Sequence, residues 1–134
     1  RSQLKKIVFN DCEQLKKLNK LTHPIIIQEI KNKIIKIQKN NKNAKIVLDV
    51  PLLIEAKMQD MVGKIIVVKC NKKEQLKRAL KKGKYSKKEI ENVIKSQMPQ
   101  KEKIKYANFV VDNNKTIIET EKQVKTIVSL LQKP

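Results

Sequence analysis

The chain has 134 residues, of which 40% are hydrophobic and 34% charged, a balance typical of one globular domain with a packed core. Two glycines, four prolines and two cysteines exclude collagen-like, low-complexity and disulfide-scaffold proteins. No uncharged apolar run approaches the roughly 20 residues of a membrane-spanning helix. A net charge of +19 favours polyanionic partners, but drift towards the AT-rich codons of Lys, Ile and Asn explains the same surplus without a partner.

The first part of the chain is predicted to be helical. Apolar residues recur at helical spacing over residues 4–21, with Asp11 as a candidate N-cap. Thr22-His23-Pro24 predicts a break, because proline suits the first turn of a new helix. That second helix is predicted to run to about residue 38, and the polar residues 39–43 form a loop.

Three short apolar segments predict strands at residues 45–54, 64–69 and 109–112. The first two are almost continuously apolar, which is typical of strands covered on both faces. Pro51 marks the end of the first strand, because proline cannot donate a hydrogen bond to a central ladder. A helix or turn over residues 55–61 leads to the second strand.

Helical segments are predicted at residues 72–82, 86–97 and 100–106. The second of them begins with a capping box formed by Ser86 and Glu89. The last helix of the chain presents one apolar face, made of Val124, Ile127, Val128 and Leu131. Strands that alternate with helices predict an α/β fold with a parallel sheet, in which ligands bind beyond the carboxyl ends of the strands.

Four residues near those strand ends or helix starts are candidates for chemistry. Asp49 ends the first strand, where it could hold Mg²⁺ through water or simply cap a helix. His23 could meet a phosphate or be structural. Arg78 is the only arginine apart from Arg1, which indicates either a bidentate anion contact or a solvated helix face. Asn113 follows the third strand, where it either forms a turn or contacts a base.

The motifs of the chain resemble those of the dephospho-CoA kinase family. The segment Leu-Asp-Val-Pro-Leu-Leu-Ile-Glu, residues 48–55, is similar to the family signature LDVPLLFE. Further similarities follow in the family's order along the whole chain: R-x-x-L-x-x-x-V-F from Arg1, THP at 22–24, Q-L-x-R at 75–78, S-x-x-E at 86–89, Q-M-P at 97–99, and A-x-x-x-x-D-N at 107–113.

This resemblance implies a three-layer P-loop kinase fold with a parallel sheet. Residues 1–134 would form a single domain, incomplete at its amino end and without the family's first two strands. Residues 1–44 would be the helical part that binds substrate, and residues 72–103 would be a helical lid. The implied activity is ATP-dependent phosphorylation of the ribose 3′-hydroxyl of dephospho-CoA, with ATP and Mg²⁺ as cofactors.

The resemblance also implies roles for individual residues. Asp49 would lie beside Mg²⁺ and the phosphates as a catalytic residue, and Arg78 would neutralise charge in the transition state. Three residues would bind dephospho-CoA, namely Arg1, His23 and Glu55. Four would bind ATP, namely Arg78, Lys82, Asn113 and Asn114. Lys82 stands where the family has a second lid arginine, and it keeps the charge but loses the bidentate fork.

The chain departs from the family in lacking the glycine-rich phosphate loop, since its two glycines are Gly63 and Gly83. We therefore expect the natural gene product to be longer. If it is not, we expect the sheet to rearrange or the chain to form a homo-oligomer. A degenerate, non-catalytic relative that binds nucleic acid or a partner chain is the alternative, although scarce aromatics and arginines oppose nucleic acid. Cys12 and Cys70 match no metal-ligand spacing and fit reduced thiols, so we expect a cytoplasmic protein.

Overall fold

The computed structural model describes residues 11–132. The chain divides into two compact units, Arg1–Met58 and Gln59–Pro134. No helix in residues 11–132 combines the length and the apolar character needed to cross a membrane.

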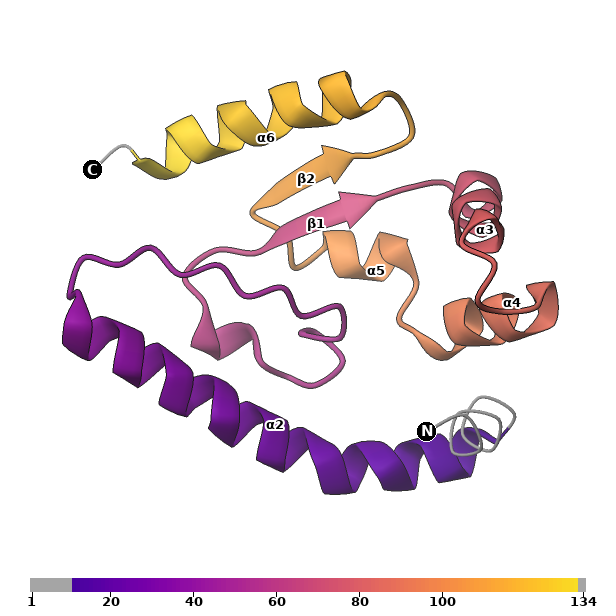
Figure 1. The fold of residues 1–134 in the computed structure, drawn as a ribbon, viewed down its shortest axis with the longest axis horizontal. Coiled ribbons are helices and arrows are strands. Elements are labelled where there is room, and N and C mark those ends of the chain that lie inside the picture. Colours follow the sequence, from indigo (N-terminus) through magenta and orange to yellow (C-terminus); the bar gives the residue numbers. More distant parts are fainter. Residues whose placement is uncertain (1–10, 133–134) are drawn as a thin grey trace. The chain divides into compact units, whose positions relative to one another are not determined.

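The first unit is dominated by one long helix, α2, which spans Cys12–Asn40 (Figure 1). The predicted N-cap is confirmed, because Asp11 Oδ1 accepts hydrogen bonds from the backbone N–H groups of Glu13 and Gln14 at 2.9 and 3.2 Å. The carboxylate therefore satisfies two of the donors that a helix start leaves unpaired.

The predicted break at residues 22–24 is wrong, because Pro24 lies inside α2. Proline removes one backbone hydrogen bond and costs about 3 kcal/mol in a helix interior. The helix continues because its many other turns keep their bonds. The hydroxyl of Thr22 adds a hydrogen bond to the Leu18 carbonyl at 2.9 Å. His23 consequently occupies the middle of a helix and not a helix start.

The strand predicted at residues 45–54 is also wrong: residues 44–50 alternate between half-buried and exposed, but they pair with no strand in the described part of the chain. Ile46 and Leu48 are half-buried, whereas Val47 is 91% exposed. The segment therefore covers one face and not two. A strand exists only with a hydrogen-bonded neighbour, which the apolar sequence alone could not supply.

Turns follow this segment, and Ile54 within them and Met58 just after them are buried. Short backbone bonds hold the turns, from Leu53 N–H to the Val50 carbonyl at 3.1 Å and from Ala56 N–H to the Leu52 carbonyl at 2.9 Å.

The second unit contains a two-stranded parallel sheet with helices packed against it. Its elements in chain order are η1 (Gln59–Met61), β1 (Ile66–Lys69), α3 (Lys72–Lys81), α4 (Lys87–Ser96), α5 (Gln100–Ile104), β2 (Phe109–Asp112) and α6 (Ile117–Gln132). β1 and β2 are parallel, with Ile66 opposite Phe109 and Lys69 opposite Asp112. The strands predicted at 64–69 and 109–112, and the four helices of this half, are confirmed.

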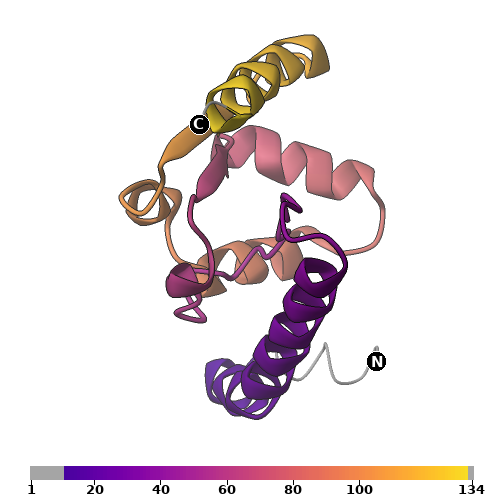
Figure 2. The same cartoon turned by 90° about the vertical axis from the view of Figure 1, so that its left-hand side faces the viewer.

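Each face of the sheet is covered over only one of its strands. Opposite residues point to the same face, so Val67 shares a face with Val110, and Val68 with Val111. Val67 and Val111 are buried at 8% and 2% exposure, whereas Val68 is 56% exposed. α6 packs along β2 and α5 beside β1 (Figures 1 and 2). The cover predicted for both faces is thus incomplete within the described residues.

The helices α3 and α4 start and stop where local chemistry requires it. The Asn71 side chain caps α3 through Glu74 N–H at 2.8 Å, and Ser86 with Glu89 forms the predicted capping box of α4. Gly83 follows α3 with a φ of 65°, a left-handed conformation that favours glycine. The chain therefore turns sharply between the two helices.

Candidate functional site: a cation-lined cavity at the strand ends

The carboxyl ends of β1 and β2 lie side by side, because Lys69 is opposite Asp112. The chain leaves the sheet at this edge through two loops, residues 70–71 before α3 and residues 113–116 before α6. A cavity of about 350 Å³ opens here, lined by Cys70, Gln75, Arg78, Ala79, Lys82, Lys84, Tyr85 and Asn113. This edge is where parallel α/β proteins bind their ligands.

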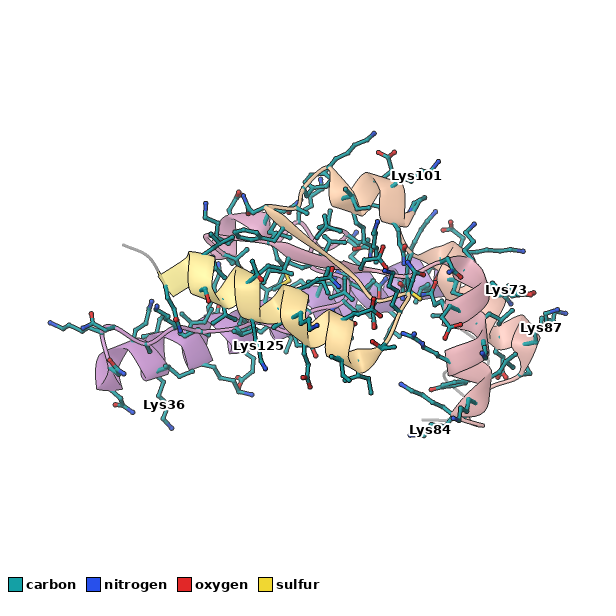
Figure 3. All side chains as sticks on the ribbon, turned by 90° about the horizontal axis from the view of Figure 1, so that it is seen from above. Lys36, Lys73, Lys84, Lys87, Lys101 and Lys125 are labelled. Carbon is teal, nitrogen blue, oxygen red and sulfur yellow. The ribbon has the colours of Figure 1, made fainter. Side chains whose placement is uncertain are left out.

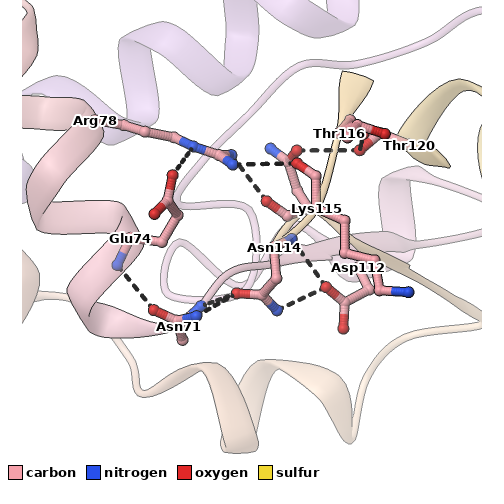
Figure 4. A network of polar contacts seen from close by, with 9 residues as sticks. Asn71, Glu74, Arg78, Asp112, Asn114, Lys115, Thr116 and Thr120 are labelled. Atoms are coloured by element: carbon pink, nitrogen blue, oxygen red, sulfur yellow. Dashed lines mark hydrogen bonds and ion pairs between the residues drawn. The ribbon is translucent and has the colours of Figure 1, made fainter. Parts of the chain in front are cut away.

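A network of amide and carboxylate groups ties the two loops together (Figure 4). Asn114 Oδ1 accepts hydrogen bonds from the backbone and side-chain nitrogens of Asn71 at 2.7 and 2.8 Å. The backbone N–H and the Nδ2 of Asn114 both donate to Asp112 Oδ1, at 2.9 and 2.6 Å. Because Asn71 also caps α3, the network fixes the start of α3 relative to the end of β2.

Asp112 is the acidic member of this network. The backbone N–H and the side chain of Asn114, followed by Lys69, lower the pKa of the Asp112 carboxyl below its ordinary value. The Lys69 ammonium lies 3.2 Å from Asp112 Oδ2. The network is therefore held by a charged carboxylate at neutral pH.

Arg78 joins α3 to the loop before α6. Its Nη1 donates to the Asn113 carbonyl at 2.8 Å, and its Nε donates to Glu74 Oε1 at 2.9 Å. A longer contact of 3.5 Å leads from Nη2 to the Lys115 carbonyl. These three contacts use three of the five guanidinium N–H groups of Arg78, which also lines the cavity.

Asn113 occupies the junction between two cavities. Its backbone N–H donates to the Lys69 carbonyl at 2.9 Å, and its Oδ1 accepts from Thr120 Oγ1 at 3.1 Å. The second cavity, of about 500 Å³, lies along α6 and is lined by Asn113, Ile117, Thr120, Glu121, Val124 and Lys125. The site thus offers a cationic side and a more apolar side, which suits a phosphorylated ligand that carries a ring.

The structure brings together three of the residues predicted from sequence: Arg78, Lys82 and Asn113 line the same cavity. Asn114 lines neither of the two cavities, and its amide oxygen and nitrogen bond within the loops, so its approach to adenine stays a prediction.

The other predicted residues belong to the first unit. There, Asp49 is exposed, while His23 and Glu55 are half-buried. Arg1 lies outside the described residues.

Sequence reasoning missed several lining residues, above all Tyr85, which is 39% exposed at the cavity. An aromatic residue is rare in this chain, which has two tyrosines, two phenylalanines and no tryptophan. A tyrosine two residues after the glycine between α3 and α4 was therefore a usable signal. Gln75 opens the Q-L-x-R motif but was given no role, and Cys70 and Lys84 carried no comparable signal.

The cation-lined cavity at the carboxyl ends of two parallel strands places the protein in the class of α/β proteins that bind ligands at this edge of the sheet. Comparison with known proteins shows which family within this class it belongs to. The family model described as dephospho-CoA kinase matches residues 1–119. The chain belongs to the dephospho-CoA kinase family.

Individual relatives agree with this assignment. The dephospho-CoA kinase of Carboxydothermus hydrogenoformans is 43% identical over 128 residues, which cover 96% of this chain and 62% of that protein. The one from Lactobacillus johnsonii is 38% identical and is covered to 64%. The chain therefore spans somewhat less than two thirds of the length of these curated relatives.

Solved structures show the same partial correspondence. The Thermus thermophilus protein TT1252 aligns with a TM-score of 0.74 and 26% identity, over 99% of this chain and 68% of that one. Dephospho-CoA kinase from Campylobacter jejuni aligns with a TM-score of 0.63 and 28% identity, over 98% and 64%.

Proposed function

We propose that the protein is a dephospho-CoA kinase, which transfers the γ-phosphoryl group of ATP to the ribose 3′-hydroxyl of dephospho-CoA. The observation that carries the proposal is the meeting of Arg78, Lys82 and Asn113 around one cavity in a chain of this family. Two cations and one amide at the carboxyl edge of a parallel sheet suit the phosphates and the base of a nucleotide.

Arg78 and Lys82 are assigned to the phosphates of ATP. Arg78 lies in α3 and Lys82 is its C-cap residue. α3 is the first helix of the segment 72–103, which we assign as the lid. Positive groups near the transferred phosphoryl stabilise the charge that spreads over its oxygens. Asn113 is assigned to the base, because it follows β2 and lines both cavities.

We assign the finer fold as a three-layer P-loop-kinase-like sheet, to which β1 and β2 belong. The similarity to the Campylobacter jejuni kinase over 98% of this chain supports this assignment. Residues 1–44, most of them in α2, would form the part that receives dephospho-CoA. The substrate would contact Arg1 and His23 within this part, and Glu55 beyond it. The 134 residues contain no glycine-rich phosphate loop, so we assign none of them to the backbone cradle that holds the ATP phosphates in such a loop.

Asp49 is the residue of this chain assigned to Mg²⁺. Among the described residues no three His, Cys, Asp or Glu side chains gather into a metal-binding group. A single exposed carboxylate nevertheless fits, because Mg²⁺ is commonly held by one or two carboxylates, water and the phosphates of the substrate. When bound, Mg²⁺ would neutralise phosphate charge, and Asp49 would orient a water ligand.

The distribution of lysine supports a small-molecule site over a nucleic-acid surface. The labelled lysines in Figure 3 come from α2, α3, α4, α5, α6 and the α3–α4 loop, so the charge is not confined to one element. Only four aromatic residues are available in the chain for base stacking.

The test is product formation by the protein expressed from its complete reading frame. We expect ATP and dephospho-CoA to give ADP and coenzyme A in equal amounts, with the new phosphate at the ribose 3′ position by mass spectrometry. Lys82→Ala should slow the reaction, whereas Lys77→Ala, an exposed change one turn earlier on α3, should not. Hydrolysis of ATP without formation of coenzyme A would contradict the proposed function.

A further inference from the structure

Within the described residues, the hydroxyl of Thr120 on α6 donates a hydrogen bond to the side chain of Asn113. We propose that Thr120 is a positioning residue, which turns the side-chain amide of Asn113 towards the base of the bound nucleotide. This inference rests on the nucleotide-binding part of the proposed function.

The backbone of Asn113 is held from two sides. Its N–H donates to the Lys69 carbonyl at 2.9 Å, and its carbonyl accepts from Arg78 Nη1 at 2.8 Å. Only the two side-chain torsions of Asn113 are therefore left to be set. Thr120 sets them, because its Oγ1 lies 3.1 Å from Asn113 Oδ1.

The direction of this hydrogen bond decides what the ligand meets. A side-chain amide oxygen can only accept, so the Thr120 hydroxyl must donate. The Nδ2 group of Asn113 then has no role in this bond and is available as a donor to a ligand. A donor at this place complements a ring nitrogen of a purine, which is an acceptor.

The hydroxyl of Thr120 has a second acceptor within reach, the Thr116 carbonyl at 3.2 Å. A hydroxyl has one hydrogen, so the two bonds compete. When the proton goes to Thr116, the amide of Asn113 is no longer held. A nucleotide that accepts from Asn113 favours the arrangement in which Thr120 donates to Asn113.

The experiment compares two ligands by calorimetry on the protein expressed from its complete reading frame. ATP carries phosphates and a base, whereas inorganic tripolyphosphate carries phosphates only. Thr120→Val removes the hydroxyl at nearly constant volume, and Thr120→Ser restores it. Thr126→Val is the matched control, because Thr126 also lies on α6, bonds the Lys122 carbonyl at 3.1 Å and lines neither cavity.

We expect Thr120→Val to raise the Kd of ATP roughly three- to tenfold, the value of one ordinary hydrogen bond, and to leave the Kd of tripolyphosphate unchanged. Thr120→Ser should bind ATP like the unaltered protein, and so should Thr126→Val. Should Thr120→Val not fold, as judged by circular dichroism, Thr120→Ala removes the same hydroxyl with a better helix former.

Three results would overturn the inference: an unchanged Kd for ATP, an equal loss for both ligands, and no binding of ATP by the unaltered protein. Its failure is distinguishable from that of the proposed function. A Thr120-dependent affinity for ATP without formation of coenzyme A contradicts the kinase assignment alone. Formation of coenzyme A with an unchanged affinity in Thr120→Val contradicts this inference alone.

Discussion

Replacement of Arg78 by alanine should weaken the second unit, because the guanidinium joins α3 to the loop after β2. The bond from Nη1 to the Asn113 carbonyl involves a charged donor and contributes about 1.5–3 kcal/mol. The pair with Glu74 has side chains 39% and 27% exposed, so it adds only about 0.5 kcal/mol. The 3.5 Å contact with the Lys115 carbonyl is too long to add much. Arg78→Ala should thus lower the free energy of unfolding by about 2–3.5 kcal/mol.

The assay is urea unfolding of the whole chain, followed by circular dichroism. In a thermal melt of the same protein, a loss of this size corresponds to a Tm lower by roughly 10 °C for a chain of this length. Lys77→Ala, on the exposed side of α3, is the control and should change stability by less than about 0.5 kcal/mol. Arg78→Lys keeps a charge near Glu74 but loses the fork, so it should resemble Arg78→Ala. An Arg78→Ala protein as stable as the control would refute the structural role of this arginine.

Three further predictions concern the same unit. Gly83→Ala should cost about 1 kcal/mol in urea unfolding because φ is 65° there, whereas Gly63→Ala, with open space around the new Cβ and no positive φ, should be close to neutral; equal effects would contradict this reading. Since hydrogen bonds from Asn114 lower the folded-state pKa of Asp112, the stability that they contribute should be present above about pH 4 and lost as the pH falls through the folded pKa. Asp112→Asn should flatten that acid dependence, and an unchanged slope would count against it. Alkylation of Cys70, which lines the cavity, should slow when ATP is added, and a rate unaffected by saturating ATP would argue that the nucleotide lies elsewhere.

Sequence reasoning succeeded where the signal was local. The N-cap at Asp11 and the capping box at Ser86 follow from residues within three positions of each other. β1 and β2 were recognisable as short apolar runs between helices, and each has the other as its hydrogen-bonded neighbour.

It failed at two places, Pro24 and the apolar residues 45–50. Pro24 reads as a helix start, yet the turns on both sides of it continue one helix. The apolar residues 45–50 read as a buried strand, but a strand requires a paired neighbour, and the described residues supply none. The proline was read as a start although the helix runs on through it, and the apolar run was read as a strand although no neighbour pairs with it in the described part of the chain.

The candidate site shows the same division. Arg78 was identifiable as the one internal arginine among many lysines, but its bond to the Asn113 carbonyl joins residues 35 positions apart. The amide network of Asn71, Asn114 and Asp112 also links two loops that only the folded sheet brings together. The sequence therefore identified candidate residues. Only the structure shows which of them line the cavity and which hold the two loops together.

The most direct measurement of the central claim is a map of where ATP binds. The protein expressed from its complete reading frame would be photolabelled with 8-azido-ATP and digested, and the labelled peptides identified by mass spectrometry. The account predicts labelling of the peptides that contain Tyr85 or Asn113, suppressed by excess ATP and not by excess inorganic phosphate. Labelling confined to peptides from residues 1–58, or labelling insensitive to ATP, would contradict it.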